Sequence, residues 1–200
     1  MSDLFAEKAK DWDKSEQKTG MAAAIGSAIF EHVALNESMT VLDFGAGTGL
    51  IAAQLAPRVK HIVAIDTSQA MLDKLAQKSE LKGKVEMLNR DIIERPLDKT
   101  FDLIVSAMAM HHVEDTAKLL QRFHEHLADG GLVVLCDLDE EDGSFHPPGT
   151  EGVYHAGFDR YALGELMRLN GFTDVTFRTA HQFRGETRDY PIFMVTARKA

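Results

Sequence analysis

The sequence predicts an α/β fold in which helices cover both faces of a doubly wound sheet. Short apolar runs typical of strands alternate along the chain with amphipathic segments. A strand, a crossover helix and a parallel strand form the repeating unit of such sheets, and right-handed crossovers place helices on both faces. Acidic or glycine residues stand where the first two runs end, at the edge where these sheets bind ligands. The candidate strands are 41–44, 62–65, 85–88, 101–106, 132–136, 175–179 and 192–196.

The N-terminal part is predicted to form a helix that lies against this sheet. Apolar residues recur there every four positions and so share one helix face. They are Met21, Ile25, Ile29 and Val33. Residues 1–35 are therefore expected to cover the fold rather than to act as a linker.

Two later helices have recognisable ends. Asp115 is a suitable N-cap for a helix that stops at the pair Gly130 and Gly131. Asp159 is the N-cap type of the last helix, which ends at Asn170-Gly171. The apolar faces expected of these helices carry Leu120, Phe123 and Leu127, and Leu163, Leu166 and Met167.

Composition indicates an ordinary folded protein. Of the 200 residues, 44% are hydrophobic and 26% are charged, close to globular averages. The net charge of -9 disfavours nucleic-acid partners, because phosphate backbones would be repelled on average. Cys136 is the single cysteine, so no intramolecular disulfide forms, and its apolar run predicts a buried core residue. With neither a secretory signal nor an apolar run long enough for a membrane span, we expect a cytoplasmic protein.

The first strand runs into a glycine-rich loop that is suited to a nucleotide-like ligand. Residues 41–49 read Val-Leu-Asp-Phe-Gly-Ala-Gly-Thr-Gly, and the helical stretch 50–56 follows. Glycines allow a ligand to approach the backbone, and the helix N-terminus offers free N–H groups. Leu50 stands where the dinucleotide fingerprint needs its third glycine, and Gly49-Leu50-Ile51 lacks the lysine and hydroxyl of a phosphate loop.

Asp66 lies 21 residues after Gly45, at the end of the second apolar run. A carboxylate there can accept hydrogen bonds from both hydroxyls of a ribose. The alternative is a cap for the helix that starts near Thr67-Ser68. Together with the glycine loop, the position favours ribose binding.

The order of these motifs resembles that of class I S-adenosylmethionine-dependent methyltransferases that act on small molecules, such as the type 11/12 and quinone-biosynthesis enzymes. The resemblance rests on residues 41–49, 63–68 with Met71-Leu72, 89–92, 101–106, 111–113 and 127–132. It implies a Rossmann-like, mostly parallel sheet of seven strands whose last strand, 192–196, is antiparallel. It also implies S-adenosylmethionine as cofactor, with S-adenosylhomocysteine as product.

The resemblance further assigns cofactor contacts. It puts Asp43 near the amino group, Asp66 on the ribose hydroxyls and Asp91 on the adenine amino group. Ile92 would line the base, and Ala107 would lie beside the sulfonium. The remaining implied contacts are the loop residues Gly45, Ala46, Gly47 and Gly49, then Thr67, Met71 on the base, and Trp12 of an aromatic-Asp segment that closes over the cofactor.

Methyl transfer is an in-line displacement from an activated donor, so a general base is optional. The candidate bases are His111, His112 and His155, although the pair after the fourth run is also compatible with a structural role. The polar segment 139–158, which includes His146 and Tyr154, is expected to cover the acceptor or to be a solvated loop. We expect no metal site, since zinc-ligand spacing is absent and the acidic run 139–142 is typical of a solvated turn.

These inferences predict one domain over residues 1–200, with a helical cover (1–35), a cofactor-binding core (36–136) and an acceptor-side part (137–200). The expected partner is a small-molecule acceptor. A non-catalytic module that senses the cofactor or scaffolds a partner would keep every motif, and a nicotinamide-dependent oxidoreductase would share the fold and Asp66. The sequence leaves the acceptor and the oligomeric state open.

Overall fold

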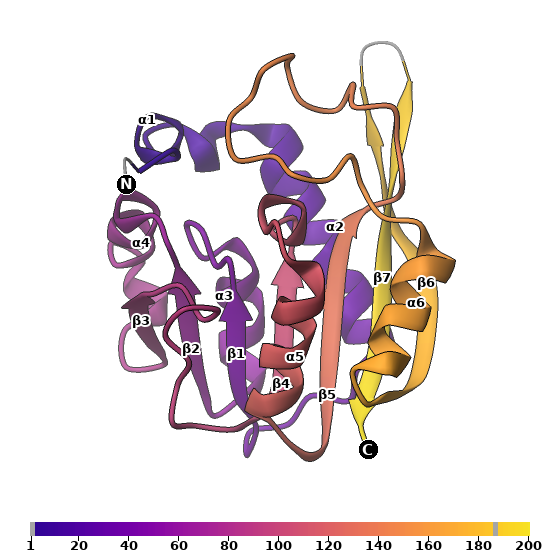
Figure 1. Cartoon of the computed structure of the whole chain (residues 1–200). Coiled ribbons are helices and arrows are strands. Elements are labelled where there is room, and N and C mark those ends of the chain that lie inside the picture. The colour runs from indigo at the N-terminus through magenta and orange to yellow at the C-terminus, as the bar shows by residue number, and fades with distance from the viewer. Residues whose placement is uncertain (1–2, 186–187) are drawn as a thin grey trace.

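The computed structural model describes residues 3–185 and 188–200 and contains a sheet of seven strands in the order β3-β2-β1-β4-β5-β7-β6 (Figure 1). Neighbouring strands within the group β1 to β5 are parallel to one another. Strand β7 is antiparallel to both β5 and β6. The predicted doubly wound sheet with an antiparallel last strand is thus confirmed. The strands are β1 (Thr40–Phe44), β2 (His61–Asp66), β3 (Val85–Asn89), β4 (Phe101–Ala107), β5 (Leu127–Leu138), β6 (Phe172–Arg184) and β7 (Asp189–Lys199).

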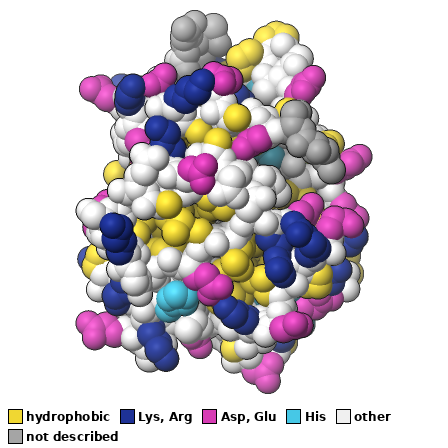
Figure 2. All heavy atoms as spheres, turned by 90° about the vertical axis from the view of Figure 1, so that its left-hand side faces the viewer, with side chains coloured by type: hydrophobic (Ala, Val, Ile, Leu, Met, Phe, Trp, Pro, Cys, Tyr) yellow, Lys and Arg dark blue, Asp and Glu magenta, His cyan; other side chains and the backbone are white. Residues whose placement is uncertain are grey.

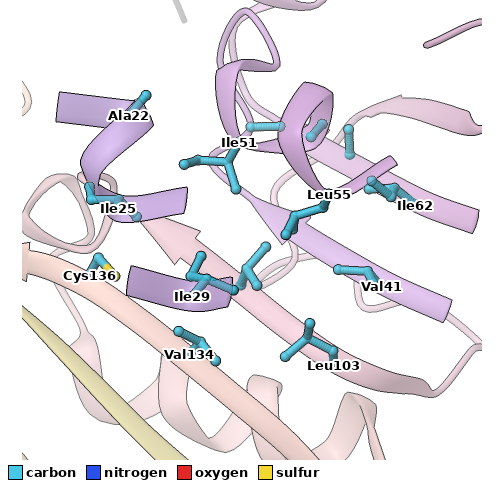
Figure 3. Close-up of a cluster of buried hydrophobic side chains, with 14 of the residues drawn as sticks. Ala22, Ile25, Ile29, Val41, Ile51, Leu55, Ile62, Leu103, Val134 and Cys136 are labelled. Atoms are coloured by element: carbon cyan, nitrogen blue, oxygen red, sulfur yellow. The ribbon is translucent and has the colours of Figure 1, made fainter. Parts of the chain in front are cut away.

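Alternating side chains of the central strands enter two separate cores, one on each face of the sheet. In β1, Val41 joins one core and Leu42 the other, as the two-residue period of a strand requires. Figure 3 shows the first core, where Ile25 and Ile29 lie opposite Leu55 and above the sheet. Cys136 is buried there, and burial raises the pKa of its thiol, so it is a core residue as predicted.

Helices α2 and α3 pack on the first face, and α5 and α6 pack on the second. The helices are α1 (Ala6–Ala9), α2 (Glu16–His32), α3 (Leu50–Leu55), α4 (Gln69–Leu75), α5 (Thr116–His126) and α6 (Arg160–Leu169). Asp115 and Asp159 cap α5 and α6 as predicted, since their carboxylates accept from Lys118 N and Ala162 N. In the described residues, no helix is long and apolar enough to cross a bilayer.

One predicted helix end is wrong. The sequence predicts that Leu127 lies on the same helix face as Phe123 and that this helix ends at Gly130 and Gly131. Instead α5 ends at His126, and Leu127 begins β5, where it pairs with Phe101. Leu127 is buried in the same core in either case, so the apolar pattern does not distinguish the two local structures.

The topology gathers loops at one edge of the sheet. Strand order reverses between β1 and β4, which is the point where doubly wound sheets bind ligands. The carboxyl ends of β1, β2, β4 and β5 point toward the top of Figure 1, where α1 and the loop 139–158 lie. Figure 2 shows the side of the molecule at β3 and α4, where acidic and basic side chains are interspersed around exposed hydrophobic ones. This side presents no continuous basic surface for a polyanion.

Candidate active site

A cavity of about 740 Å³ opens at the carboxyl edge of the sheet. This volume lies within the range of small-molecule and cofactor sites. Its walls come from the glycine loop, the ends of β2 and β4, the segment 89–95, the N-terminal residues 3–25 and the loop residues Gly152 and Tyr154. Segments far apart in the sequence therefore meet at the predicted position.

The glycine loop is shaped by contacts that only glycine permits. Gly45 has a φ of +66°, and a Cβ atom there would lie 2.3 Å from Ala109 Cβ. The amides of Gly45 and Ala46 donate to Ile65 O at 2.9 and 3.1 Å, and Gly47 N donates to Asp66 Oδ2 at 2.7 Å. The loop is thus fixed against β2, with Gly45, Ala46 and Gly47 on the cavity wall.

Asp43 is a buried carboxylate with unused hydrogen-bonding capacity. Asp43 is only 1% exposed, yet it lines the cavity. Its Oδ2 has no hydrogen-bond partner among the described residues. Burial, followed by the nearby Asp66, raises the pKa of Asp43 to about 7. A buried acceptor without a partner costs stability, which a ligand cation or donor would relieve.

Asp66 holds the loop as well as facing the cavity. Its Oδ1 accepts from Ser68 N at 2.8 Å and its Oδ2 from Gly47 N. Helix α4 is capped by Ser68, whose Oγ accepts from Met71 N, so the alternative role of Asp66 as the cap is wrong. Burial raises the pKa of Asp66. A carboxylate has about four lone-pair positions, so two remain for a ligand.

Of the other residues expected to contact the cofactor near its adenine base, some line the cavity and one lies in the core. Asp91, Thr67 and Met71 line the cavity. Asp91 Oδ1 accepts from Ile93 N at 2.8 Å. The side chain of Ile92 is fully buried in the second core, and Ile93 lines the cavity instead, because successive side chains point in different directions.

Gly49, the last glycine of the loop, packs against a helix rather than lining the cavity. With a φ of +81°, it packs so closely that a Cβ atom would lie 2.7 Å from Leu75 Cγ. Gly49 is the N-cap of α3 and is not among the lining residues. Its glycine identity is explained by helix packing.

The N-terminal segment closes one side of the cavity. Trp12 lines it, with Lys18 Nζ 3.6 Å from the centre of its ring. Asp13 accepts a hydrogen bond from Thr48 Oγ1 of the glycine loop and forms an ion pair with Lys78 at 2.9 Å. Trp12 therefore belongs to the cavity and to neither core, which favours the aromatic-Asp interpretation of this segment.

Among the charged residues of the cavity wall, acidic ones outnumber basic ones. Seven lining residues are acidic, whereas four are Lys or Arg. The acidic ones are Asp3, Asp43, Asp66, Asp91, Glu94, Glu114 and Asp115, and the basic ones are Lys18, Arg90, Arg95 and Lys118. This balance favours a cationic ligand over the diphosphate of a nicotinamide dinucleotide.

Two of the predicted histidines lie together after β4. His111 is buried, and its Nδ1 donates to Asp137 Oδ1 at 2.6 Å. His112 lines the cavity, and its Nδ1 donates to the carbonyl oxygen of Gly152 at 2.6 Å. Burial and the neighbouring His111 lower the pKa of His112 to about 4, so its Nε2 keeps a lone pair at neutral pH.

The third predicted histidine has a bridging position. His155 Nε2 donates to Val113 O at 2.9 Å and lies 3.2 Å from Thr116 Oγ1. It attaches the loop 139–158 to the start of α5 and is not among the lining residues, and nor is His111. Of the three candidate bases, the structure places only His112 on the cavity wall.

Sequence reasoning missed Asp137 and the position of His146. Asp137 is fully buried at the end of β5 and also accepts from the amides of Met110 and Leu138. An aspartate inside an apolar strand was the available signal. His146 Nε2 lies 3.2 Å from His111 Nε2, a proximity between two loops that no sequence spacing encodes. In the acidic run 139–142, Asp139 forms an ion pair with Arg160 and Asp142 with Arg188.

Fold and cavity together describe a nucleotide-type cofactor site at the switch point of a doubly wound sheet. Comparison with known proteins identifies the family. The sequence model of a methyltransferase domain family matches residues 19–177, so the chain belongs to this family. It is a class I S-adenosylmethionine-dependent methyltransferase, as the motifs predicted.

Individual proteins agree with this assignment. The chain is 30% identical over 200 residues to an uncharacterized methyltransferase of Geobacillus sp. (strain WCH70), covering 90% of this chain and 92% of the relative. It is 31% identical over 147 residues to an uncharacterized methyltransferase of Schizosaccharomyces pombe, and this match spans 65% of the chain but about half, 52%, of that relative. The crystal structure of an S-adenosylmethionine-dependent methyltransferase from Aquifex aeolicus shares the fold, with a TM-score of 0.72, 23% identity and 98% of each chain covered.

Proposed function

We propose that this protein transfers the methyl group of S-adenosylmethionine to a small-molecule acceptor within the cavity at the carboxyl edge of the sheet. The observation that carries the proposal is Oδ2 of buried Asp43, which has no hydrogen-bond partner among the described residues and lies on the wall of the cavity beside the glycine loop. S-adenosylmethionine carries an ammonium and a sulfonium, so its charge complements this wall. When bound, it supplies a methyl group that is already activated for displacement.

The residues of the chain divide the binding work. Asp43 Oδ2 would accept from the cofactor ammonium, and this contact would favour the ionised form of its carboxyl. Asp66 would use its remaining lone pairs for the ribose hydroxyls while holding Gly47 in place. Asp91 would accept from the base through the oxygen that Ile93 N does not occupy. Met71 and Trp12 would provide apolar surface around the base and the methionyl chain.

The far end of the cavity would bind the acceptor. Ala107, His112 and Tyr154 line it, and the ring of Phe5 stands edge-on to His112, with centroids 5.2 Å apart. A position beside these partly aromatic side chains suits a small organic molecule, and the excess of acidic over basic lining residues disfavours a nucleic acid. The lone pair of His112 Nε2 would accept a proton from an acceptor whose nucleophile is protonated.

The cavity also bears on the alternative of a non-catalytic module. Such a module needs no acceptor pocket, whereas this cavity extends from Asp43 to Tyr154. This extent supports catalysis over cofactor sensing alone.

Calorimetry with S-adenosylhomocysteine tests the cofactor part of the proposal. We expect saturable binding by the wild-type protein and by the control Asp129→Asn, whose side chain is 99% exposed. We expect weakened binding by Asp43→Asn. Release of S-adenosylhomocysteine from S-adenosylmethionine with pooled small thiols, phenols, amines and carboxylates then tests turnover. Binding without turnover of any acceptor class would favour the sensing module, and absence of binding would overturn the proposal.

A further inference from the structure

Three histidine side chains converge beside the acceptor end of the cavity. His111 and His112 follow β4, and His146 comes from the loop 139–158. One ring nitrogen of each lies within 4.8 Å of one from each of the others. The rings of His111 and His112 have centroids 4.1 Å apart, and those of His111 and His146 are 5.1 Å apart.

Two of the rings are oriented by partners on their far nitrogens. His111 Nδ1 donates to the carboxylate of Asp137, and His112 Nδ1 donates to the carbonyl oxygen of Gly152. In the neutral tautomer with the proton on Nδ1, each Nε2 carries a lone pair, and His111 Nε2 lies 3.2 Å from His146 Nε2. Histidines that ligate metals usually donate the second ring N–H to a carboxylate or a backbone carbonyl, which fixes the tautomer. His111 and His112 each show one of these two arrangements.

We propose that His111, His112 and His146 form a binding site for a divalent transition-metal ion of the zinc type. Imidazole nitrogens suit zinc, copper, nickel and iron(II), whereas calcium and magnesium require oxygen ligands. Three histidines with a remaining open position are also the ligand set of some catalytic zinc sites.

The distance between ring nitrogens fits an ion. Tetrahedral ligands at about 2.0–2.1 Å from zinc lie about 3.3 Å apart. His111 Nε2 and His146 Nε2 are separated by 3.2 Å. His112 is the third ligand, with a ring nitrogen within 4.8 Å of one on each of the other two rings, and His146 is half-buried on a loop whereas His111 is buried. Asp137 is a fully buried carboxyl group that accepts from His111 Nδ1, the arrangement of a carboxylate behind a metal-ligating histidine.

The site adjoins the proposed acceptor position, because His112 is also part of the cavity wall. A bound ion would use the lone pair of His112 Nε2, so metal binding and proton acceptance are alternative uses of one atom. An ion there would act as a Lewis acid toward an acceptor heteroatom. This catalytic consequence rests on the proposed function, whereas metal binding itself does not.

The test is titration of tag-free, chelator-treated full-length protein with zinc or cobalt(II) alone. We expect one metal per chain by calorimetry, and cobalt(II) absorption typical of tetrahedral nitrogen ligands. Saturation with zinc at about 100 times its dissociation constant should raise the melting midpoint by about 5 to 10 °C. S-adenosylhomocysteine is omitted, so that failure of the cofactor assignment would leave this result unaffected.

Two variants locate the ion. His146→Ala should weaken zinc affinity at least about 100-fold, since loss of a direct ligand exceeds the 10- to 100-fold effect of outer partners. The control His32→Ala, an exposed histidine on α2, should bind like the wild type. Unchanged affinity in His146→Ala, or no binding by wild-type protein, would overturn the proposal. A wild-type-like circular dichroism spectrum and urea midpoint of metal-free His146→Ala show that lost binding is not lost folding.

Discussion

Replacement of Asp43 by asparagine should separate the requirements of folding from those of binding. The side chain is buried, and burial with the nearby Asp66 raises its pKa from 3.8 to about 7. Asparagine has almost the same shape but never ionises. The comparison of Asp43→Asn with the wild type therefore isolates the energetic cost of a buried carboxylate.

The magnitude follows from proton linkage. The unfolded carboxyl ionises near its ordinary value of 3.8, whereas the folded one stays protonated until about 7. The folded state thus binds the extra proton, and this contribution to stability is complete at low pH and is lost as pH rises through 7. The full loss is about 4 kcal/mol, and about 3 kcal/mol of it falls between about pH 5 and pH 8.5.

Urea unfolding at these two pH values measures the effect. The free energy of unfolding of Asp43→Asn minus that of the wild type should increase by about 3 kcal/mol from about pH 5 to pH 8.5. Most contributions of other titrating groups cancel in this difference. The control Asp129→Asn removes a carboxylate at a 99% exposed position, where charge interactions are screened, and should show a much smaller change between the two pH values.

A difference for Asp43→Asn that is the same at both pH values would refute the reasoning. It would mean that the carboxylate of Asp43 is already compensated in the folded protein, so that its Oδ2 is not poised for a ligand cation. The same reasoning predicts that wild-type affinity for S-adenosylhomocysteine falls as pH drops below about 7, because the ammonium needs the ionised carboxylate. In Asp43→Asn the affinity should be lower and nearly independent of pH in that range.

Further predictions concern the glycine loop and Asp66, which accepts a hydrogen bond from it. Asp66→Ala should weaken S-adenosylhomocysteine binding by about 10- to 100-fold in calorimetry, because charge-assisted hydrogen bonds contribute about 1.5 to 3 kcal/mol; unchanged affinity would reject its role on the ribose. Gly45→Ala should lower the free energy of unfolding by about 2 to 4 kcal/mol, since backbone strain at a φ of +66° adds to a clash with Ala109 Cβ. Gly83→Ala is the matched control in the same urea assay, because Gly83 has a φ of +78° with nothing within 4 Å of the added Cβ; equal losses in both variants would show that the loop has room for a side chain.

Much of the cofactor side of this site was predictable because its signals are local. The apolar run before Gly45 and the aspartate at the end of the next run each lie within one strand and its following turn. Parallel strands bring their carboxyl ends to one edge, so two local signals are enough to define a common site. The cavity wall accordingly includes Asp43, Gly45, Asp66 and Asp91.

Predictions failed where one local pattern serves two structures. Leu127 continues the apolar face of a helix, yet it is the first residue of β5. A helix and a strand would both bury it in the same core, so its apolar character does not distinguish them. Ile92 and Ile93 are equally apolar, and only the path of the chain after β3 decides that Ile92 is fully buried in the core while Ile93, at the edge of that core, lines the cavity.

The sequence by itself predicted the sheet and its ligand-binding edge, since strand periodicity and glycine spacing are local properties, and its resemblance to a known family indicated the cofactor class. Only the tertiary structure decided the surroundings of the acceptor. It brought His146 from the loop 139–158 to His111, placed Asp137 behind that ring and, within the part of the chain that the structure describes, left Asp43 Oδ2 without a partner. These relations depend on distances between segments about 26 to 35 residues apart in the chain or on what burial leaves unpaired, which are set by packing rather than by sequence spacing.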